Sequence, residues 1–244
     1  ATVLLGEPFA DVVWLNSQDA VPALVQANMI LPLEKYIDFD DPRLDKDSMS
    51  TVEYEGHVYG FHNAKLGGGG GLWYNRTLFQ REGFPDPQLF TASGDWDWDT
   101  FRELARRATK DTDGDGKVDQ YGLTIGYEFE YFIIWSNGGR IVRQTDEGFR
   151  FTMDEPEVIE ALQFVSNIYE AGFAEPLGEQ AFIDGRAAMY FGYLFQGGNI
   201  IQNMQDEYGY AFWPKGPSAD DYQSMGAGGA AMFFPANLNY PPER

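Results

Sequence analysis

Short apolar segments alternate with amphipathic helical segments along this chain. The run at 11–15 is typical of a buried strand, and the segment that follows, 19–28, has apolar residues at helical spacing. Helical spacing returns at 100–109 and most clearly at 154–172, which opens with an acidic turn and closes on glycine. This alternation favours layered α/β architecture over a β-sandwich or a helical bundle.

An uninterrupted glycine run, Gly67 to Gly71, separates two segments of strand character. Residues 54–61 resemble a hairpin turn leading into a strand, and 72–75 resume a strand. A phosphate-binding loop is not expected here, because no Lys-Ser or Lys-Thr pair follows the glycines. The run instead indicates backbone freedom, at a place where the chain swivels or crosses between lobes.

The charge balance limits the partners of the chain. Its 38 acidic residues outnumber its 17 basic ones and give a net charge of −21. Such a surface repels phosphate backbones and anionic lipids, so nucleic acid and membrane surfaces are poor partners. A neutral ligand suits this field best, and an anionic ligand would need a special local site. Aromatic residues reach 16%, a surplus that often lines a cleft for ring-shaped ligands.

Several classes of active site are absent from the sequence. There is no cysteine, which excludes disulfides, thiolate zinc sites and cysteine nucleophiles. Neither a nucleophile elbow nor a phosphate-cradling motif occurs, and two histidines, His57 and His62, are too few to indicate a triad. No apolar run is long enough to span a bilayer. We therefore expect a protein that catalyses nothing.

An acidic loop at 111–119 has the pattern of a calcium site. Carboxylates at alternate positions of a tight loop converge on one point, and hard oxygen ligands suit Ca²⁺. The expected ligands are Asp111, Asp113, Asp115, the backbone carbonyl of Lys117, and Asp119. Gly122 stands where such a loop normally carries a bidentate glutamate. The pattern therefore predicts either a structural calcium site or a solvated acidic loop.

Several segments together resemble extracellular solute-binding protein family 1, the sugar-binding receptors of ABC importers. The matching blocks follow the order of the family and span nearly the whole chain: Asp11 to Trp14, Gly71 to Arg76, Asp95 to Phe101, Thr109 to Leu123, Gly138-Gly139, the helix at 154–172, and Phe182 to Met189. The Asp11 block departs from the family in having Ala10 in place of proline.

The resemblance implies the fold of periplasmic binding proteins of class II, with two α/β lobes joined by a crossover hinge. The first lobe would comprise 1–66 and 218–244, and the second 67–217. The family pattern extends beyond both ends of this sequence, so the chain resembles a central portion and both lobes are expected to be incomplete.

The resemblance also implies a function. The chain would bind a mono- or oligosaccharide between its lobes, as a monomeric extracytoplasmic receptor (periplasmic or a cell-surface lipoprotein) that docks on the permease of an ABC importer, with no cofactor. Aromatic faces would stack on sugar C–H faces while polar groups bind hydroxyls. The expected ligand residues are Asn16, Ser17, Gln18, Asp19, Asn63, Glu128, Tyr131, Trp135, Phe195, Trp213 and Gly228.

Two alternatives remain open at this point. The same aromatics and the many carboxylates suit a glycan-processing enzyme, which needs a pair of carboxylic groups flanking the scissile bond. The loop at 111–119 suits a calcium-dependent carbohydrate-interaction module.

Overall fold

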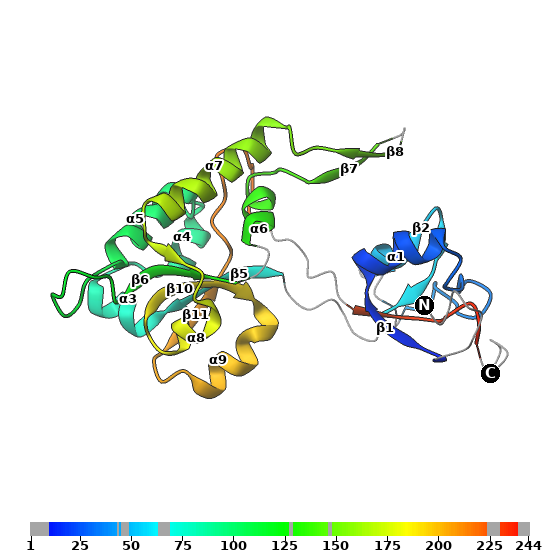
Figure 1. Ribbon diagram of the computed structural model, residues 1–244, viewed down its shortest axis with the longest axis horizontal. Helices are drawn as coiled ribbons and strands as arrows, with labels where there is room; N and C mark the ends of the chain where they lie inside the picture. Colours follow the sequence, from blue (N-terminus) through cyan, green and yellow to red (C-terminus); the bar gives the residue numbers. More distant parts are fainter. Residues whose placement is uncertain are drawn as a thin grey trace. The chain divides into compact units, whose positions relative to one another are not determined.

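The computed structural model describes residues 10–42, 44, 49–62, 69–126, 129–145, 148–223 and 230–238 (Figure 1). Tertiary contacts divide the chain into two compact units. The first comprises Ala1–Gly67 and Gly226–Arg244, and the second comprises Gly68–Met225. No helix in the described ranges combines the length and apolar character needed to cross a membrane.

The second unit is built on a five-stranded mixed sheet in the order β11-β5-β10-β6-β9. The strands are β5 (Gly70–Asn75), β6 (Tyr121–Ile125), β9 (Ala174–Glu175), β10 (Ala187–Tyr193) and β11 (Tyr208–Ala211). The β10–β6 and β6–β9 pairs are parallel, whereas β5 pairs antiparallel with both β10 and β11. Strands β5 and β10 are buried along nearly their whole length, as expected for a sheet covered on both faces.

Helices cover both faces of this sheet, with α5 and α7 on one side and α8 and α9 on the other (Figure 1). The helices of this unit are α3 (Arg76–Glu82), α4 (Pro87–Ser93), α5 (Trp98–Ala108), α6 (Phe129–Ser136), α7 (Pro156–Glu170), α8 (Gly178–Ile183) and α9 (Gly197–Asn203), with a short 3₁₀ turn η3 (Leu194–Gln196). A two-stranded hairpin, β7 (Val142–Thr145) and β8 (Gly148–Phe151), precedes α7.

The two strongest helix predictions are confirmed in place, with one difference in capping. The side chain of Asp97 accepts a hydrogen bond from the Thr100 backbone N–H at 2.8 Å and caps α5. Helix α7 has Pro156 in its first turn, but Glu155 makes no side-chain capping bond. The Glu155 carboxylate binds Arg143 at 3.0 Å instead.

The first unit has a small antiparallel sheet in the order β1-β12-β4. Its strands are β1 (Val13–Asn16), β4 (Gly60–Phe61) and β12 (Ala230–Phe233), packed with α1 (Ser17–Gln26). A 3₁₀ turn, η2 (Ser50–Val52), precedes the hairpin of β2 (Glu53–Tyr54) and β3 (His57–Val58). That hairpin turns at Glu55 and Gly56, both in the left-handed region at φ of 51° and 77°.

The boundaries of the two units differ from the expected lobes at the return crossing. Residues 218–225 belong to the second unit, because the Ser218 backbone N–H donates to Asn137 Oδ1 at 2.9 Å.

Part of the glycine run has a packing role that the interpretation as a swivel did not include. Gly70 and Gly71 are strand residues of β5 buried beneath Phe132 and Tyr210, so their lack of a side chain serves packing there.

Candidate functional site

Two elements of the second unit leave the same edge of its sheet. Helix α6 follows β6, and the turn η3 follows β10 directly. Because β6 and β10 are parallel neighbours, their carboxyl ends lie at one edge. The start of β5 reaches this edge too, since Gly70 pairs with Tyr193. In open α/β sheets, ligands bind outside the carboxyl ends of the strands.

Helix α6 presents an aromatic face at this edge. Phe129, Phe132 and Ile133 are buried, whereas Tyr131 is 45% exposed and Trp135 is partly exposed. Tyr131 and Trp135 stand four residues apart and therefore share one side of the helix. Both were predicted to contact ligand, and the structure puts them on the side of α6 that remains accessible.

Phe195 lies in η3 and is the most exposed aromatic side chain of the edge, at 72%. It stacks on Tyr193 with ring centroids 5.1 Å apart, and Tyr193 in turn contacts Phe132 of α6 at 5.3 Å. Sequence reasoning identified Phe195 but missed Tyr193, two residues earlier at the end of β10. We call Tyr131, Trp135, Tyr193 and Phe195 the aromatic edge.

A partly buried glutamine–tyrosine contact holds η3 in place. Gln196 Nε2 donates to the Tyr190 hydroxyl at 2.5 Å, while Gln196 Oε1 accepts from the Tyr193 backbone N–H at 2.7 Å. Burial raises the pKa of Tyr190 to about 12, so its hydroxyl stays protonated at neutral pH. Gln196 Nε2 also donates to Glu179 Oε2 at 3.2 Å, so the turn that carries Phe195 is held by hydrogen bonds to α8 and β10.

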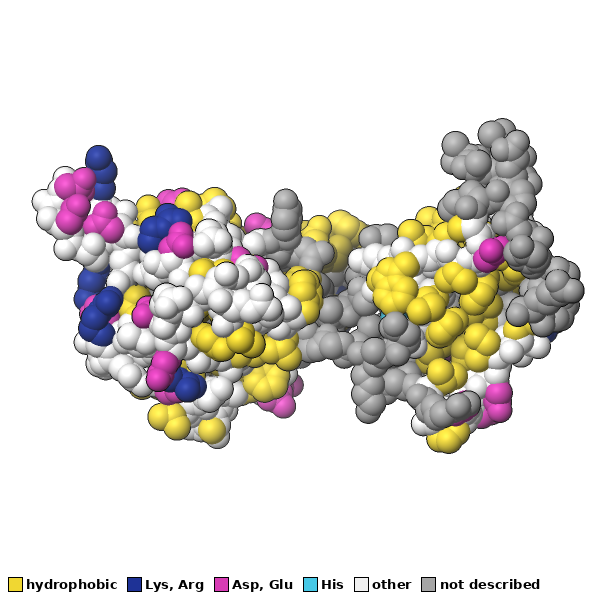
Figure 2. Space-filling view, turned by 90° about the horizontal axis from the view of Figure 1, so that it is seen from below, with side chains coloured by type: hydrophobic (Ala, Val, Ile, Leu, Met, Phe, Trp, Pro, Cys, Tyr) yellow, Lys and Arg dark blue, Asp and Glu magenta, His cyan; other side chains and the backbone are white. Residues whose placement is uncertain are grey.

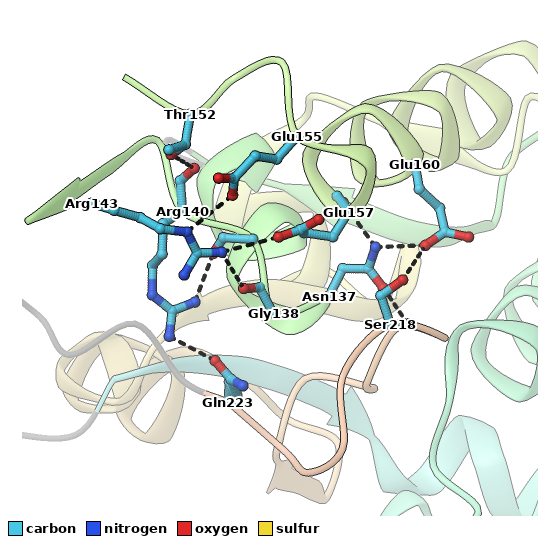
Figure 3. Close-up of polar contacts among 11 residues, drawn as sticks. Asn137, Gly138, Arg140, Arg143, Thr152, Glu155, Glu157, Glu160, Ser218 and Gln223 are labelled. Atoms are coloured by element: carbon cyan, nitrogen blue, oxygen red, sulfur yellow. Dashed lines mark hydrogen bonds and ion pairs between the residues drawn. The ribbon is translucent and has the colours of Figure 1, made fainter. Parts of the chain in front are cut away.

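A polar network fixes the far end of α6 (Figure 3). Asn137 Nδ2 donates to the Glu157 carbonyl and to Glu160 Oε2, both at 2.8 Å. Ser218 Oγ donates to the same Glu160 oxygen at 2.9 Å. Helix α6, helix α7 and the return segment at 218 are thus tied together next to the aromatic edge.

Arg140 and Arg143 lie in the same network and were not singled out from the sequence. Arg143 pairs with Glu155 and Glu157, each at 3.0 Å. Arg140 lies over the ring of Trp135, 3.7 Å from its centroid, and Nη2 donates to Gln223 Oε1 at 2.8 Å. Arg140 and Gln223 are 83 residues apart, and the acidic partners of Arg143 lie 12 and 14 residues along the chain, so no local sequence pattern marks these contacts.

Trp213, predicted to contact ligand, is a core residue, which corrects that prediction. It is only 2% exposed and packs against Phe101, Phe129 and Phe191 with ring centroids 4.9 to 5.4 Å apart. Its neighbour Phe212 is 52% exposed instead. The extended backbone after β11 turns alternate side chains in and out, and Trp213 falls on the inner side.

The remaining predicted ligand residues belong to the first unit or lie outside the described residues. Asn16 ends β1 with an exposed side chain, and Ser17 begins α1 fully buried. Gln18 and Asp19 follow in the first turn of α1. Three others, Asn63, Glu128 and Gly228, lie outside the described residues.

The acidic loop brings three of its predicted ligands together. Carboxylate oxygens of Asp111, Asp113 and Asp115 lie within 4.8 Å of one another, and all three residues are exposed. Asp111 accepts from the backbone N–H groups of Gly116 at 2.8 Å and Gly114 at 2.6 Å, which hold the pKa of its carboxyl below the usual value. These two glycines have φ near 80–90°, a conformation that glycine adopts without strain.

The other two predicted metal ligands, Asp119 and Lys117, make contacts of another kind. Asp119 Oδ2 accepts from the backbone N–H and the hydroxyl of Thr112 at 2.8 and 2.9 Å, and it is not part of the three-carboxylate group. The side chain of Lys117 points to Asp115 Oδ2 at 3.7 Å. The loop thus closes on itself through Asp119 while three carboxylates face one point.

The position of Gly122 explains the missing glutamate. A Cβ at this residue would lie 2.0 Å from the Ala105 carbonyl oxygen, because β6 packs directly on α5. No side chain fits there, so the loop departs from the usual calcium pattern for a reason of packing.

Comparison with solved structures supports the fold class predicted from sequence. The chain resembles the ABC substrate-binding protein Lmo0181 from Listeria monocytogenes in complex with cycloalternan (20% identity, TM-score 0.76, covering 98% of this chain and 60% of that one). It also resembles the maltose/maltodextrin-binding domain MalE from Bdellovibrio bacteriovorus bound to maltotriose (19%, 0.73, 99% and 61%). UgpB from Mycobacterium tuberculosis in complex with glycerophosphocholine is similar to it as well (20%, 0.78, 99% and 59%).

The chain thus spans about 60% of the length of these structures. No curated protein matches it by sequence. The family model of the bacterial extracellular solute-binding proteins matches residues 3–243, nearly the whole sequence. The resemblance seen in the ordered sequence blocks is therefore confirmed, and the chain belongs to the bacterial extracellular solute-binding protein family.

Proposed function

We propose that this protein is the saccharide-binding receptor of an ABC-type importer. The observation that carries the proposal is the aromatic edge, where rings are exposed beside a hydrogen-bonded polar network. Sugar rings present apolar C–H faces and polar rims, and such a surface complements both. Solved structures of the same fold were bound to maltotriose and cycloalternan, which supports a saccharide as the ligand class here.

The proposal includes the setting in which the receptor works. Its family consists of extracellular solute-binding proteins, which supports an extracytoplasmic location. The proposed receptor is a monomer that delivers its ligand to a membrane permease. It also supports binding without chemistry and without a cofactor. Incubation with a set of chromogenic glycosides tests that point, because a receptor releases no product whereas a glycan-processing enzyme does.

Substituting Phe195 by alanine should weaken saccharide binding by about tenfold, since one stacking face contributes about 1–1.5 kcal/mol beyond its buried area. Isothermal titration calorimetry against a panel of mono- and oligosaccharides measures the effect. The matched control is Ile201→Ala, because Ile201 is equally apolar and 59% exposed on α9. Equal affinities for the two variants would exclude Phe195 from the site, and no heat with any saccharide would reject the sugar ligand altogether.

We further propose that the loop at 111–119 holds a structural Ca²⁺. Three carboxylates that face one point repel one another, and a divalent cation relieves that repulsion. Asp111, Asp113 and Asp115 would supply the charged ligands, and backbone carbonyls or water would complete the shell. With only three carboxylates the affinity should be low, in the range of about 0.1–1 mM known for extracellular modules.

Calcium should raise the melting temperature of the protein at millimolar concentration, because an ion that binds only the folded loop stabilises it by mass action. Differential scanning calorimetry with calcium, and then with a chelator, measures the shift. Asp113→Asn should abolish the response, while Asp220→Asn, an equal change of charge at an exposed position, should retain it. An identical melting temperature with calcium and with chelator would leave the loop as a solvated acidic turn.

A further inference from the structure

Arg140 holds a positive charge against the aromatic edge in one fixed orientation. Its guanidinium covers one face of Trp135 at 3.7 Å, a cation–π arrangement. Nη1 donates to the Gly139 carbonyl at 2.6 Å and Nη2 to Gln223 Oε1 at 2.8 Å (Figure 3). The backbone is fixed as well, since the Thr152 hydroxyl donates to the Arg140 carbonyl at 2.6 Å. The arginine is therefore preorganised before any ligand arrives.

This cation has no acidic partner among the described residues, where no carboxylate oxygen lies within 4.0 Å of its guanidinium. Acidic residues are nevertheless close by. Glu155 and Glu157 both turn to Arg143, only three residues along the chain, and neutralise that side chain instead (Figure 3). The network thus neutralises one arginine twice and leaves the other uncompensated.

An unneutralised arginine is notable in a protein of net charge −21. Partial burial and the nearby charge of Arg143 lower the pKa of Arg140, yet a guanidinium remains protonated in proteins. Partial burial of an unpaired charge costs free energy, and an anionic ligand that pairs with the guanidinium offsets that cost. Two of its five N–H donors are engaged within the protein, so others remain for a ligand.

We propose that Arg140 binds a carboxylate of the ligand and that the ligand is therefore an acidic saccharide, a uronic acid or an oligomer that contains one. The proposal rests on the saccharide-receptor function proposed above and narrows it. A planar guanidinium fork matches a carboxylate with two parallel hydrogen bonds. The guanidinium covers one face of Trp135, so that face supports the arginine and does not stack on a sugar. A phosphate would carry more charge than this single free arginine balances.

Arg140 also supplies the special local site that an anionic ligand needs in this acidic field. The global charge slows the approach of an anion, and ionic strength screens that repulsion over about 8–10 Å. The close contact is screened much less, because the guanidinium is partly buried. Binding of an acidic sugar should therefore persist in physiological salt.

The test compares uronate trimers (galacturonate, mannuronate, guluronate) with their methyl esters, which have the same rings and no charge. Calorimetry should find one acid that binds at least about tenfold more tightly than its ester, the usual gain from a charge-assisted bidentate pair. Arg140→Gln should reduce the affinity for that acid to the level of the ester and leave the ester unchanged. Arg150→Gln removes the same charge from an exposed position of β8 and should retain the preference.

Each of the other possible outcomes would reject one defined part of the proposal. Acids and esters bound equally would leave the saccharide receptor standing and reject the acidic ligand class. A preference that survives Arg140→Gln would reject Arg140 as its origin. Preferential binding of a sugar phosphate would reject the carboxylate, and binding of no saccharide would remove the function itself. Melting curves verify folding; if Arg140→Gln unfolds, Arg140→Lys keeps the charge without the fork and should lose most of the preference.

Discussion

Replacing Trp213 by alanine is expected to lower the free energy of unfolding of the second unit by about 3–5 kcal/mol. The indole fills the space between α5, α6 and β10, where it packs edge-on against Phe129 and Phe191 and contacts Phe101. Removing it leaves a cavity lined by rigid aromatic rings that cannot collapse into the space. Denaturation by urea, followed by far-ultraviolet circular dichroism, measures the loss.

The neighbouring residue provides the control for this change. Phe212 is an aromatic residue of similar size but is half-exposed, so Phe212→Ala should cost about 1 kcal/mol or less. If Trp213→Ala kept its stability and lost only ligand affinity, the assignment of Trp213 to the core would be wrong and the original prediction of a ligand contact would return.

Replacing Gly122 by alanine should destabilise the same unit by about 3 kcal/mol or more, because the added methyl group has no room. Its Cβ would lie 2.0 Å from the Ala105 carbonyl oxygen, and a backbone atom inside a helix cannot turn aside as a side chain can. Helix α5 would have to move away from β6. Thermal melting of the purified variant measures the effect.

Gly198 provides a matched control, because alanine should have the opposite effect on stability there. An added Cβ there meets nothing within 4 Å, and the residue lies in helix α9. Gly198→Ala should therefore stabilise the protein slightly, by about 0.4–1 kcal/mol, through the entropy of the unfolded chain. Equal melting temperatures for Gly122→Ala and Gly198→Ala would contradict the close packing of β6 on α5.

The sequence predicted those elements whose pattern is local. Helix α7 falls within the predicted range because its apolar stripe and flanking signals lie in one segment. Trp213 was misplaced because two aromatic residues stand side by side in an extended segment, and a shift of one residue exchanges the inner and outer faces. Only packing against α5 and α6 decides which of the two is buried.

For the candidate site, as for the fold, the sequence pointed only to residues next to elements with a clear local pattern. Tyr131, Trp135 and Phe195 were named as ligand residues from the resemblance to the family. All three side chains are at least partly exposed, and their contact with ligand stays a prediction. Arg140 could not be found in this way. Its lack of an acidic partner among the described residues depends on the pairing of Glu155 and Glu157 with Arg143, and its orientation depends on Gln223, 83 residues away in the chain. Ion-pair choice among several nearby acids is a property of the folded arrangement alone.

The strand order of the first unit bears on how the chain is made. Strand β12 lies between β1 and β4 and pairs with both, whereas β1 and β4 do not pair with each other. A ribosome releases β1 and β4 long before Ala230–Phe233 emerges, so the strand that joins them in the described sheet is made last. The second unit, by contrast, is continuous at Gly68–Met225 and can fold as soon as it is complete. The sheet of the first unit therefore closes only after the whole of the second unit has been synthesised.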